Sequence, residues 1–146
     1  MKIFSPAFAE NQMIPDRHAR DGLDRSPPLR IEDVPREAKT LAIIVDDPDA
    51  PGGTFTHWLL FNIGPFAKEI SENDETHMGT LGRNDYGDIG YGGPKPPSGE
   101  HRYVFKLYAL DRVLTLSRGA KRAEVESAMT GHILAQSQTI GRYAAK

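Results

Sequence analysis

The chain has 146 residues and a mass of 16.2 kDa, so we expect one domain over residues 1–146. Eighteen Lys and Arg against twenty Asp and Glu leave a net charge of −2, which makes nucleic acid and anionic membranes poor partners. The absence of cysteine excludes disulfides, thiolate metal sites and a cysteine nucleophile. No apolar run reaches the length of a membrane-spanning helix, and Pro6 and Glu10 interrupt any signal-peptide core, so a cytoplasmic location is expected.

The predicted elements are mainly strands. Thr40–Asp47 is apolar on both faces, as a central strand must be, and His57–Ile63 is a second apolar run. His101–Leu110 alternates between apolar and polar residues, which is typical of a strand with one buried face. A short strand is expected at Val113–Leu116 and a weakly alternating terminal strand at Gln136–Tyr143.

One helix is predicted at about 121–134, although Lys121 is a poor N-cap. Two segments rich in glycine and proline, 15–35 and 79–99, are predicted to be irregular, and a loop as long as 79–99 is usually functional. Strands followed by one late helix predict a mostly β or α+β domain.

The first motif that could carry chemistry is Asp46-Asp47-Pro48-Asp49-Ala50-Pro51-Gly52-Gly53, which closes the first apolar strand. Three carboxylates fall within four positions, and the prolines stiffen the chain between them. The segment is either a charged turn whose aspartates accept backbone hydrogen bonds, or a rigid pair of carboxylates directed into a cleft.

Histidines provide the second set of candidates. Strand alternation places His57 with Leu59 and Phe61, opposite Trp58, Leu60 and Asn62, so His57 is either a core residue or a ligand contact. Trp58 is expected in the sheet core or a dimer contact. Among the other histidines, His18 and His77 are expected in solvent and His132 in the core.

The third motif is the segment 90–103, Gly-Tyr-Gly-Gly-Pro-Lys-Pro-Pro-Ser-Gly-Glu-His-Arg-Tyr. Its glycines allow backbone N–H groups to face an anion, and its prolines limit flexibility. It could instead be a surface loop, or a polyproline ligand for another domain. Together with Asp47 and His57, the residues His101 and Tyr103 stand at strand ends, where a pocket for a phosphate or carboxylate group could form.

These motifs resemble the phosphatidylethanolamine-binding protein family, which includes the Raf kinase inhibitor proteins, and most closely its bacterial and archaeal branch. The resemblance rests on Asp47-Pro48-Asp49-Ala50-Pro51, on a histidine at the start of the next strand, and on the Pro-rich loop that leads to His101-Arg102-Tyr103. The segments 4–8, 26–29 and 119–143 fit as well, so the resemblance covers about residues 3–144.

The resemblance implies a β-sandwich with a Greek-key sheet, a smaller second sheet and one or two peripheral helices. It also implies a ligand pocket, with a structural role open for Asp49 and a cis Ala50–Pro51 peptide as a candidate. The implied ligand-binding residues are Asp47, Asp49, His57, Gly93, Pro94, His101 and Tyr103. Two departures from the family pattern lie near this pocket: Phe55 replaces a frequent Trp, and Lys95 replaces a frequent Cys.

The implied function is binding of a small anion or phosphorylated ligand, such as a phospholipid head group, without catalysis and without a cofactor. Some relatives restrain kinases or proteases through the same surface, and some bacterial ones form dimers, so a protein-interaction inhibitor is the first alternative. A hydrolase with a histidine base, or a metal site at Asp47, Asp49, His57 and His101, is a further alternative, although the chain lacks the common hydrolase and metalloprotease motifs.

Overall fold

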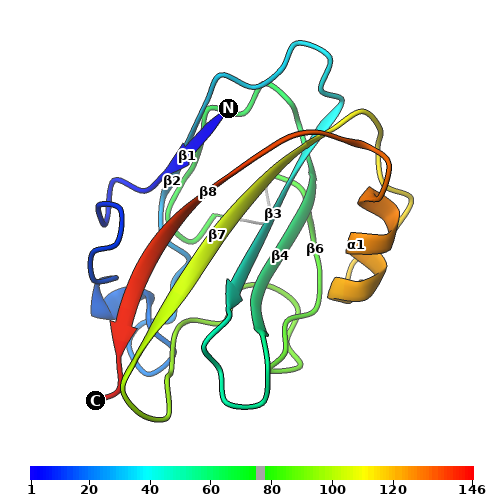
Figure 1. Ribbon diagram of the computed structural model, residues 1–146. Helices are drawn as coiled ribbons and strands as arrows, with labels where there is room; N and C mark the ends of the chain where they lie inside the picture. The colour runs from blue at the N-terminus through cyan, green and yellow to red at the C-terminus, as the bar shows by residue number, and fades with distance from the viewer. Residues whose placement is uncertain (75–77) are drawn as a thin grey trace.

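The computed structural model describes residues 1–74 and 78–146, and His77 lies outside these residues. The fold consists of two antiparallel sheets (Figure 1). The larger has the strand order β6-β4-β3-β7-β8 and the smaller the order β1-β2-β5. The strands are β1 (Lys2–Phe4), β2 (Leu29–Glu32), β3 (Thr40–Asp47), β4 (Phe55–Ile63), β5 (Glu69–Ile70), β6 (Thr80–Leu81), β7 (Glu100–Leu110) and β8 (Ile133–Ala144). A helix, α1 (Arg122–Met129), and a short 3-10 turn, Asp16–His18, complete the described elements.

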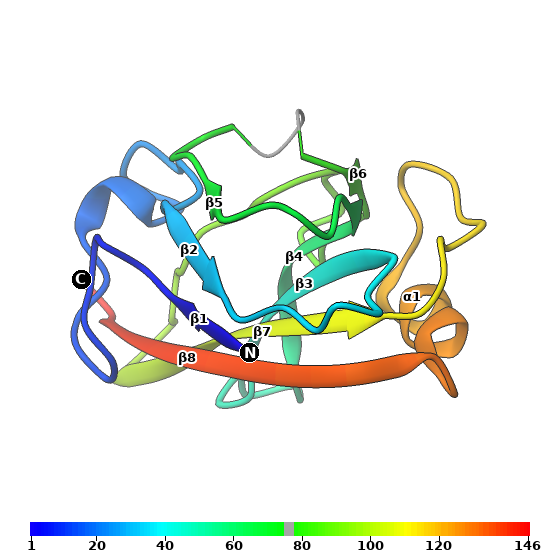
Figure 2. The same ribbon diagram turned by 90° about the horizontal axis from the view of Figure 1, so that it is seen from above.

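The two sheets enclose the main core, and α1 covers a second one. Viewed from above, the smaller sheet lies on one side of the larger, and α1 lies beside the far end of the larger sheet (Figure 2). The main core contains Trp58, Tyr103 and Phe105, all nearly free of solvent contact. The second core joins Val125 and Met129 of the helix to the opposite face of the larger sheet. The predicted mostly-β class, with a larger and a smaller sheet and a peripheral helix, is therefore confirmed.

Strand β3 is the centre of the larger sheet because it has no polar face. All its residues are buried, and it pairs with β4 on one side and with β7 on the other. Residues inside a sheet that is covered on both faces must be apolar in both directions, which is the pattern from Leu41 to Val45. Asp46 and Asp47 end the strand and are buried on opposite faces, a feature that defines the site described below.

The alternation predicted for β4 holds from Trp58 to Phe61 and fails at His57 and at Asn62. The register shift between Val45 and Asp46 lies opposite His57, so the imidazole faces Tyr103 on the side of Trp58 and not, as predicted, on the side of Leu59 and Phe61. Trp58 and Leu60 face the core between the sheets, while Leu59 and Phe61 face the helix. Asn62 has a positive φ of 55°, and a register shift accompanies it, so the strand carries a bulge there. Its amide consequently pairs with both the N–H and the carbonyl of Leu114 on the helix side of the sheet.

Two predicted elements need correction. The helix predicted at 121–134 ends at Met129, because the chain turns at Gly131 with a φ of 82° and enters β8 at Ile133. No strand forms at Val113–Leu116, where Leu114 instead packs in the second core and bonds to Asn62. The terminal strand exists and begins earlier than predicted, because the long strand β7 pairs with it from Ile133 to Ala144.

Two histidines differ from expectation. His18 is fully buried, with its Nδ1 2.9 Å from the carbonyl oxygen of Arg25, because the segment 15–35 folds back onto the loop near Gly93. His132 is half-exposed and pairs with Asp111 at 2.8 Å, since the helix ends before it and cannot carry it into the core. Within the described ranges, no helix is long and apolar enough to cross a membrane.

Candidate functional site

Two consecutive carboxylates at the end of β3 are buried on opposite faces of the sheet. Successive side chains of a strand point in opposite directions, so Asp46 faces the helix and Asp47 faces the other way. Asp46 forms ion pairs with Arg122 of α1 and with Lys106 of β7, the latter at 3.1 Å. Asp47 lies 2.6 Å from the imidazole Nδ1 of His101, and this contact brings the two sequence motifs together.

The Asp47 carboxylate orients the His101 ring. Its second oxygen accepts the backbone N–H of Asp49 at 2.8 Å, a local turn that fixes the side chain. A carboxylate only accepts hydrogen bonds, so the proton of the neutral ring lies on Nδ1 of His101. The other ring nitrogen, Nε2, is then left to accept from or, in the protonated ring, donate to a ligand.

His57 is held in the same way by a backbone carbonyl. Its Nδ1 lies 2.7 Å from the carbonyl oxygen of Gly92, and the Gly92 N–H donates to the His57 carbonyl at 2.9 Å. This two-way link ties the Pro-rich loop to β4 and again leaves Nε2 as the ligand-facing nitrogen. Burial lowers the pKa of His57 below its ordinary value, so the neutral ring is favoured in the unliganded protein.

Aromatic rings surround His57. The ring centroids of Phe55, Tyr103 and Tyr86 lie 4.8, 5.2 and 5.6 Å from that of the imidazole. Burial raises the pKa of Tyr86 to about 12, and its hydroxyl donates to the carbonyl of Gly93 at 2.8 Å. Burial and the nearby Asp47 carboxylate also raise the pKa of Tyr103, so this hydroxyl stays protonated.

These side chains line a hollow of about 160 Å³. Of the residues predicted to bind a ligand, Asp47, His57, His101 and Tyr103 line it. Lys95 and Phe55, the two departures from the family pattern, line it too. Its remaining walls are Ala50, Pro51, Tyr86 and Pro97. Sequence reasoning missed Tyr86, which precedes the recognised motif and carries no pattern of its own.

Asp49, Gly93 and Pro94 lie outside this lining. Asp49 accepts two hydrogen bonds from the guanidinium of Arg102, at 2.8 and 3.0 Å, and this pairing lowers the pKa of Asp49 to about 2. The Gly93 N–H, expected to face an anion, donates to the carboxylate of Asp24 at 2.7 Å. The Pro94 carbonyl accepts the N–H of Arg20 at 3.0 Å. These residues support the walls of the hollow rather than lining it.

The N-terminal segment therefore fixes the Pro-rich loop from behind. Asp24 holds Gly93, and Arg20 lies 4.1 Å above the ring of Tyr86. Sequence reasoning missed Asp24 and Arg20, because nothing in their spacing connects them to a loop about 70 residues away. The Ala50–Pro51 peptide, a candidate for the cis form, is trans.

Gly93 offers a test of this support. A Cβ at this position would lie 2.2 Å from the carbonyl oxygen of His18, a backbone atom that cannot move alone. We expect Gly93→Ala to destabilise the fold by about 1–3 kcal/mol, as overpacking does. Urea unfolding would measure the loss, and Gly52→Ala, where a Cβ meets open space, is the matched control. Equal stability of the two variants would contradict the close packing of the loop.

The pKa of His57 sets a pH dependence. His57 is protonated near pH 6.5 in the unfolded chain and only at a lower pH in the folded chain. The neutral, buried ring therefore makes its full contribution to the free energy of unfolding above about pH 6.5. This contribution is lost as the pH falls through the folded-state pKa. His18, also lowered by burial, acts in the same direction. We expect the free energy of unfolding to fall below pH 6.5, and His57→Gln to reduce this slope. Denaturant titrations at several pH values measure the slopes.

A metal centre at the four residues considered above is not assembled. Among the described residues, no group of three or more His, Cys, Asp or Glu side chains is placed to hold an ion. Asp49 is engaged by Arg102, and the Nδ1 atoms of both histidines are engaged by other acceptors. The site is instead a small hollow with two imidazoles, one carboxylate and one lysine.

Fold and site together define a class: a two-sheet β domain with a small pocket at the strand ends, where an Asp–His pair meets a second buried histidine. The family model described as phosphatidylethanolamine-binding protein matches residues 4–144. Because this match covers nearly the whole chain, the chain belongs to the phosphatidylethanolamine-binding protein family.

Similar proteins occur in archaea and bacteria. The UPF0098 protein of Methanothermobacter thermautotrophicus is 48% identical and the match covers 98% of both chains. The crystal structure of a phosphatidylethanolamine-binding protein homologue from Chlamydia trachomatis has a TM-score of 0.93 at 39% identity, covering 99% of this chain and 97% of that one. Escherichia coli YbcL, described as a new member of the mammalian family, has a TM-score of 0.92 at 28% identity, covering 99% and 98%.

Proposed function

We propose that the hollow binds a small anion, a phosphate monoester or carboxylate group, and that the protein is a binding protein rather than an enzyme. The observation that carries this proposal is the pair of buried imidazoles whose Nδ1 atoms are both fixed by acceptors, at 2.6 Å for His101 and 2.7 Å for His57. Each ring thereby directs its second nitrogen to a ligand, and binding an anion favours the protonated, donating form.

Other residues of the hollow support this chemistry. The Tyr103 side chain lines the hollow and its hydroxyl stays protonated, so it can donate a hydrogen bond to a ligand oxygen. Lys95 adds a cation at the rim, 3.4 Å from Asp21, with more than half of its side chain exposed. Asp47 carries the opposite charge, but its oxygens are engaged by His101 and by the Asp49 N–H, so it orients an imidazole and does not face a ligand alone.

The size of the hollow limits the ligand to a head group. Pockets that enclose drug-sized ligands have volumes of roughly 300–1,000 Å³, whereas this one has about 160 Å³. A phosphate with a short substituent fits, and the rest of a phospholipid would lie outside. Charge-assisted hydrogen bonds contribute about 1.5–3 kcal/mol each, so a few of them, after the cost of association, give micromolar to millimolar affinity.

A non-catalytic role is supported by the absence of a hydroxyl or thiol nucleophile of the Ser, Thr or Cys type from the lining. None of the residues that line the hollow is Ser, Thr or Cys, and Ser98 of the Pro-rich loop is exposed outside it. A histidine base acting on water is the remaining route to hydrolysis. Turnover of a phosphate or carboxylate ester, lost in His57→Gln, would favour the hydrolase alternative.

The test is an NMR titration of the ring and amide signals with inorganic phosphate, and in parallel with acetate. We expect saturable shifts confined to His57, His101, Lys95 and their neighbours, with tighter binding as the pH is lowered toward 6. The variant His132→Gln, a change at a half-exposed histidine outside the hollow, should bind phosphate like the native protein. Shifts that do not saturate, or that spread over surface lysines, would contradict the proposal.

A regulator of kinases or proteases is the second function to separate. In that case the protein would bind the kinase or protease through its surface, and the hollow would either form part of that binding surface or have no role. A captured protein partner whose binding is unaffected both by phosphate and by Asp47→Asn would favour surface inhibition. Loss of partner binding in Asp47→Asn would instead join the two functions in one site.

A further inference from the structure

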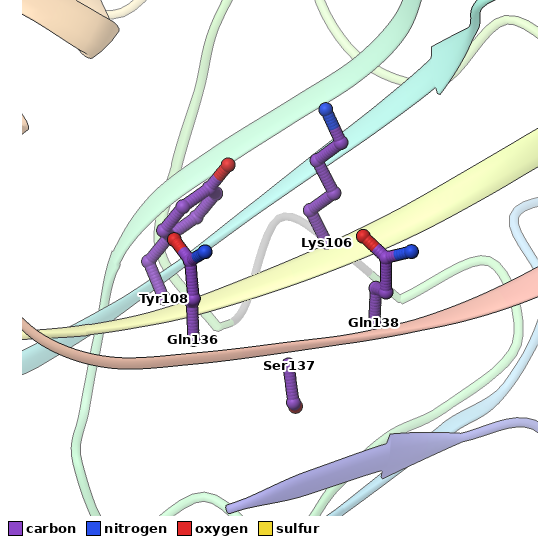
Figure 3. Close-up of a pocket in the computed structure, with 5 residues that line it drawn as sticks. All are labelled: Lys106, Tyr108, Gln136, Ser137 and Gln138. Atoms are coloured by element: carbon purple, nitrogen blue, oxygen red, sulfur yellow. The ribbon is translucent and has the colours of Figure 1, made fainter.

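A polar groove of about 310 Å³ lies on the helix side of the larger sheet. Figure 3 shows four polar side chains that point to this side, namely Lys106 and Tyr108 from β7 and Gln136 and Gln138 from β8. Tyr108 packs against the second core, which α1 covers, whereas Tyr103 of the hollow belongs to the main core. The groove and the hollow share no lining residue, so the groove is a separate cavity.

Strand pairing arranges these four side chains as two opposed pairs. Lys106 lies opposite Gln138, and Tyr108 lies opposite Gln136. Neighbouring strands are about 4.8 Å apart, and residues two positions apart along an antiparallel strand are separated by about 6.8 Å. The four positions therefore form a small rectangle whose geometry is fixed by the backbone hydrogen bonds between β7 and β8.

Much of the hydrogen-bonding capacity of this rectangle is unused. Among the described residues, neither glutamine amide and not the Tyr108 hydroxyl has a hydrogen-bond partner. Each amide has one acceptor oxygen and two N–H donors, and a hydroxyl both donates and accepts. Burial raises the pKa of Tyr108, so its hydroxyl keeps the proton that it can donate. The groove thus presents donors and acceptors side by side.

The charges beside the groove are already paired with one another. The Lys106 ammonium lies 3.1 Å from the buried Asp46 carboxylate, and Arg122 pairs with the same carboxylate and with Glu126. The Tyr108 hydroxyl lies in the electrostatic field of these two cations and two anions. An anionic ligand would compete with Asp46 for Lys106, and a cationic ligand would be repelled by the Lys106 ammonium. This balance favours a ligand without net charge.

We propose that the groove binds a neutral carbohydrate of one or two rings. Sugar hydroxyls both donate and accept hydrogen bonds, so they can satisfy the two amides and the Tyr108 hydroxyl together. The half-buried ring of Tyr108 offers an apolar surface for the C–H groups of a sugar ring. Lys106 has further N–H groups besides the one directed to Asp46. The volume of about 310 Å³ lies at the lower end of the range for small-molecule sites, roughly 300–1,000 Å³.

An NMR titration with glucose, N-acetylglucosamine and maltose tests this site, and the side-chain amide signals of Gln136 and Gln138 are the direct readout. We expect these signals to shift and saturate with a Kd of about 1–10 mM for at least one of the sugars. Glycerol at the same concentration is the control, because it has hydroxyls but no ring, and it should give no saturation. The sugar should leave the His57 and His101 signals unchanged, so the groove and the anion hollow are tested separately.

Substitutions in the groove give a second test. We expect Gln136→Ala/Gln138→Ala, which removes both amides, to weaken sugar binding at least tenfold. Tyr108→Phe keeps the ring and removes one hydroxyl, so binding should be about two- to tenfold weaker. Gln12→Ala, at an exposed glutamine outside the groove, is the matched control and should bind the sugar like the native protein. The two glutamines of the groove are exposed, so their double variant should retain the native far-UV circular dichroism.

Four results would overturn the proposal. The first is that none of the three sugars gives a saturable shift up to about 100 mM. The second is that glycerol gives the same shifts, because these would then report a change of solvent. The third is that phosphate saturates the glutamine signals at a lower concentration than any sugar, which would make the groove an anion site. The fourth is that the double alanine variant binds the sugar with native affinity.

Discussion

Replacing His101 by alanine is expected to abolish phosphate binding while leaving the fold intact. The substitution removes one of the two imidazole donors and also leaves Asp47 without its 2.6 Å partner. An unpaired carboxylate then borders the hollow and repels an anion, so the loss exceeds that of a single hydrogen bond. Since the ring lies at the end of β7, removing it leaves the sheet pairing unchanged.

The measurement is the saturable phosphate shift by NMR, with Asp47→Asn as a companion variant. The asparagine keeps an oxygen for the Asp49 N–H but removes the charge, so it separates the orienting role of Asp47 from its repulsion. We expect His101→Ala to show no saturation at concentrations at least a hundredfold above the native Kd, and Asp47→Asn to show intermediate binding. Native-like affinity in His101→Ala would remove this histidine from the site.

The second large effect is expected on stability, at the ion pairs on the helix side of the sheet. Asp46 is 1% exposed and pairs with Arg122 of α1 and Lys106 of β7. Removing one partner of a buried pair costs about 3–5 kcal/mol. Because Lys106 remains at 3.1 Å, we expect Arg122→Ala to lower the free energy of unfolding by an amount near the low end of that range.

Urea unfolding of a double-mutant cycle measures this effect. Adding Asp46→Asn to Arg122→Ala removes the buried charge that Lys106 alone then compensates, so the double variant should recover part of the lost stability. Arg118→Ala, at an exposed arginine just before the helix, is the control and should change stability little. Additive effects of the two substitutions would mean that Asp46 and Arg122 do not interact in the folded protein.

The strand prediction was most accurate where the residue pattern fitted a strand and no other element. The run Thr40–Asp47 is apolar in both directions, and the observed strand has the same bounds. The helix was predicted too long because Ile133 continued the helical spacing, although Gly131 turns the chain before it. Val113–Leu116 looked like a strand by composition, but Asn62 engages the backbone of Leu114 and no neighbouring strand pairs with the segment.

Part of the candidate site was also predictable. Asp47, His57, His101 and Tyr103 lie at strand ends, and strand ends meet at one rim of a sheet. The role of Gly93 was not predictable, because its N–H is engaged by Asp24 from a distant segment. Tyr86 and Arg20 were missed for the same reason, since their contact crosses the fold and leaves no periodic signal in the chain.

The sequence by itself determined the mostly-β class, the central strand and the two motifs of the pocket, because local alternation and turn chemistry act between near neighbours in the chain. Only the tertiary structure decided that Asp46 and Asp47 are buried on opposite faces with different partners, and that Asp49 is engaged by Arg102. The hydrogen-bond and ion-pair partners in these contacts come from segments that are distant in the sequence. They are therefore determined only by the packing of the whole chain.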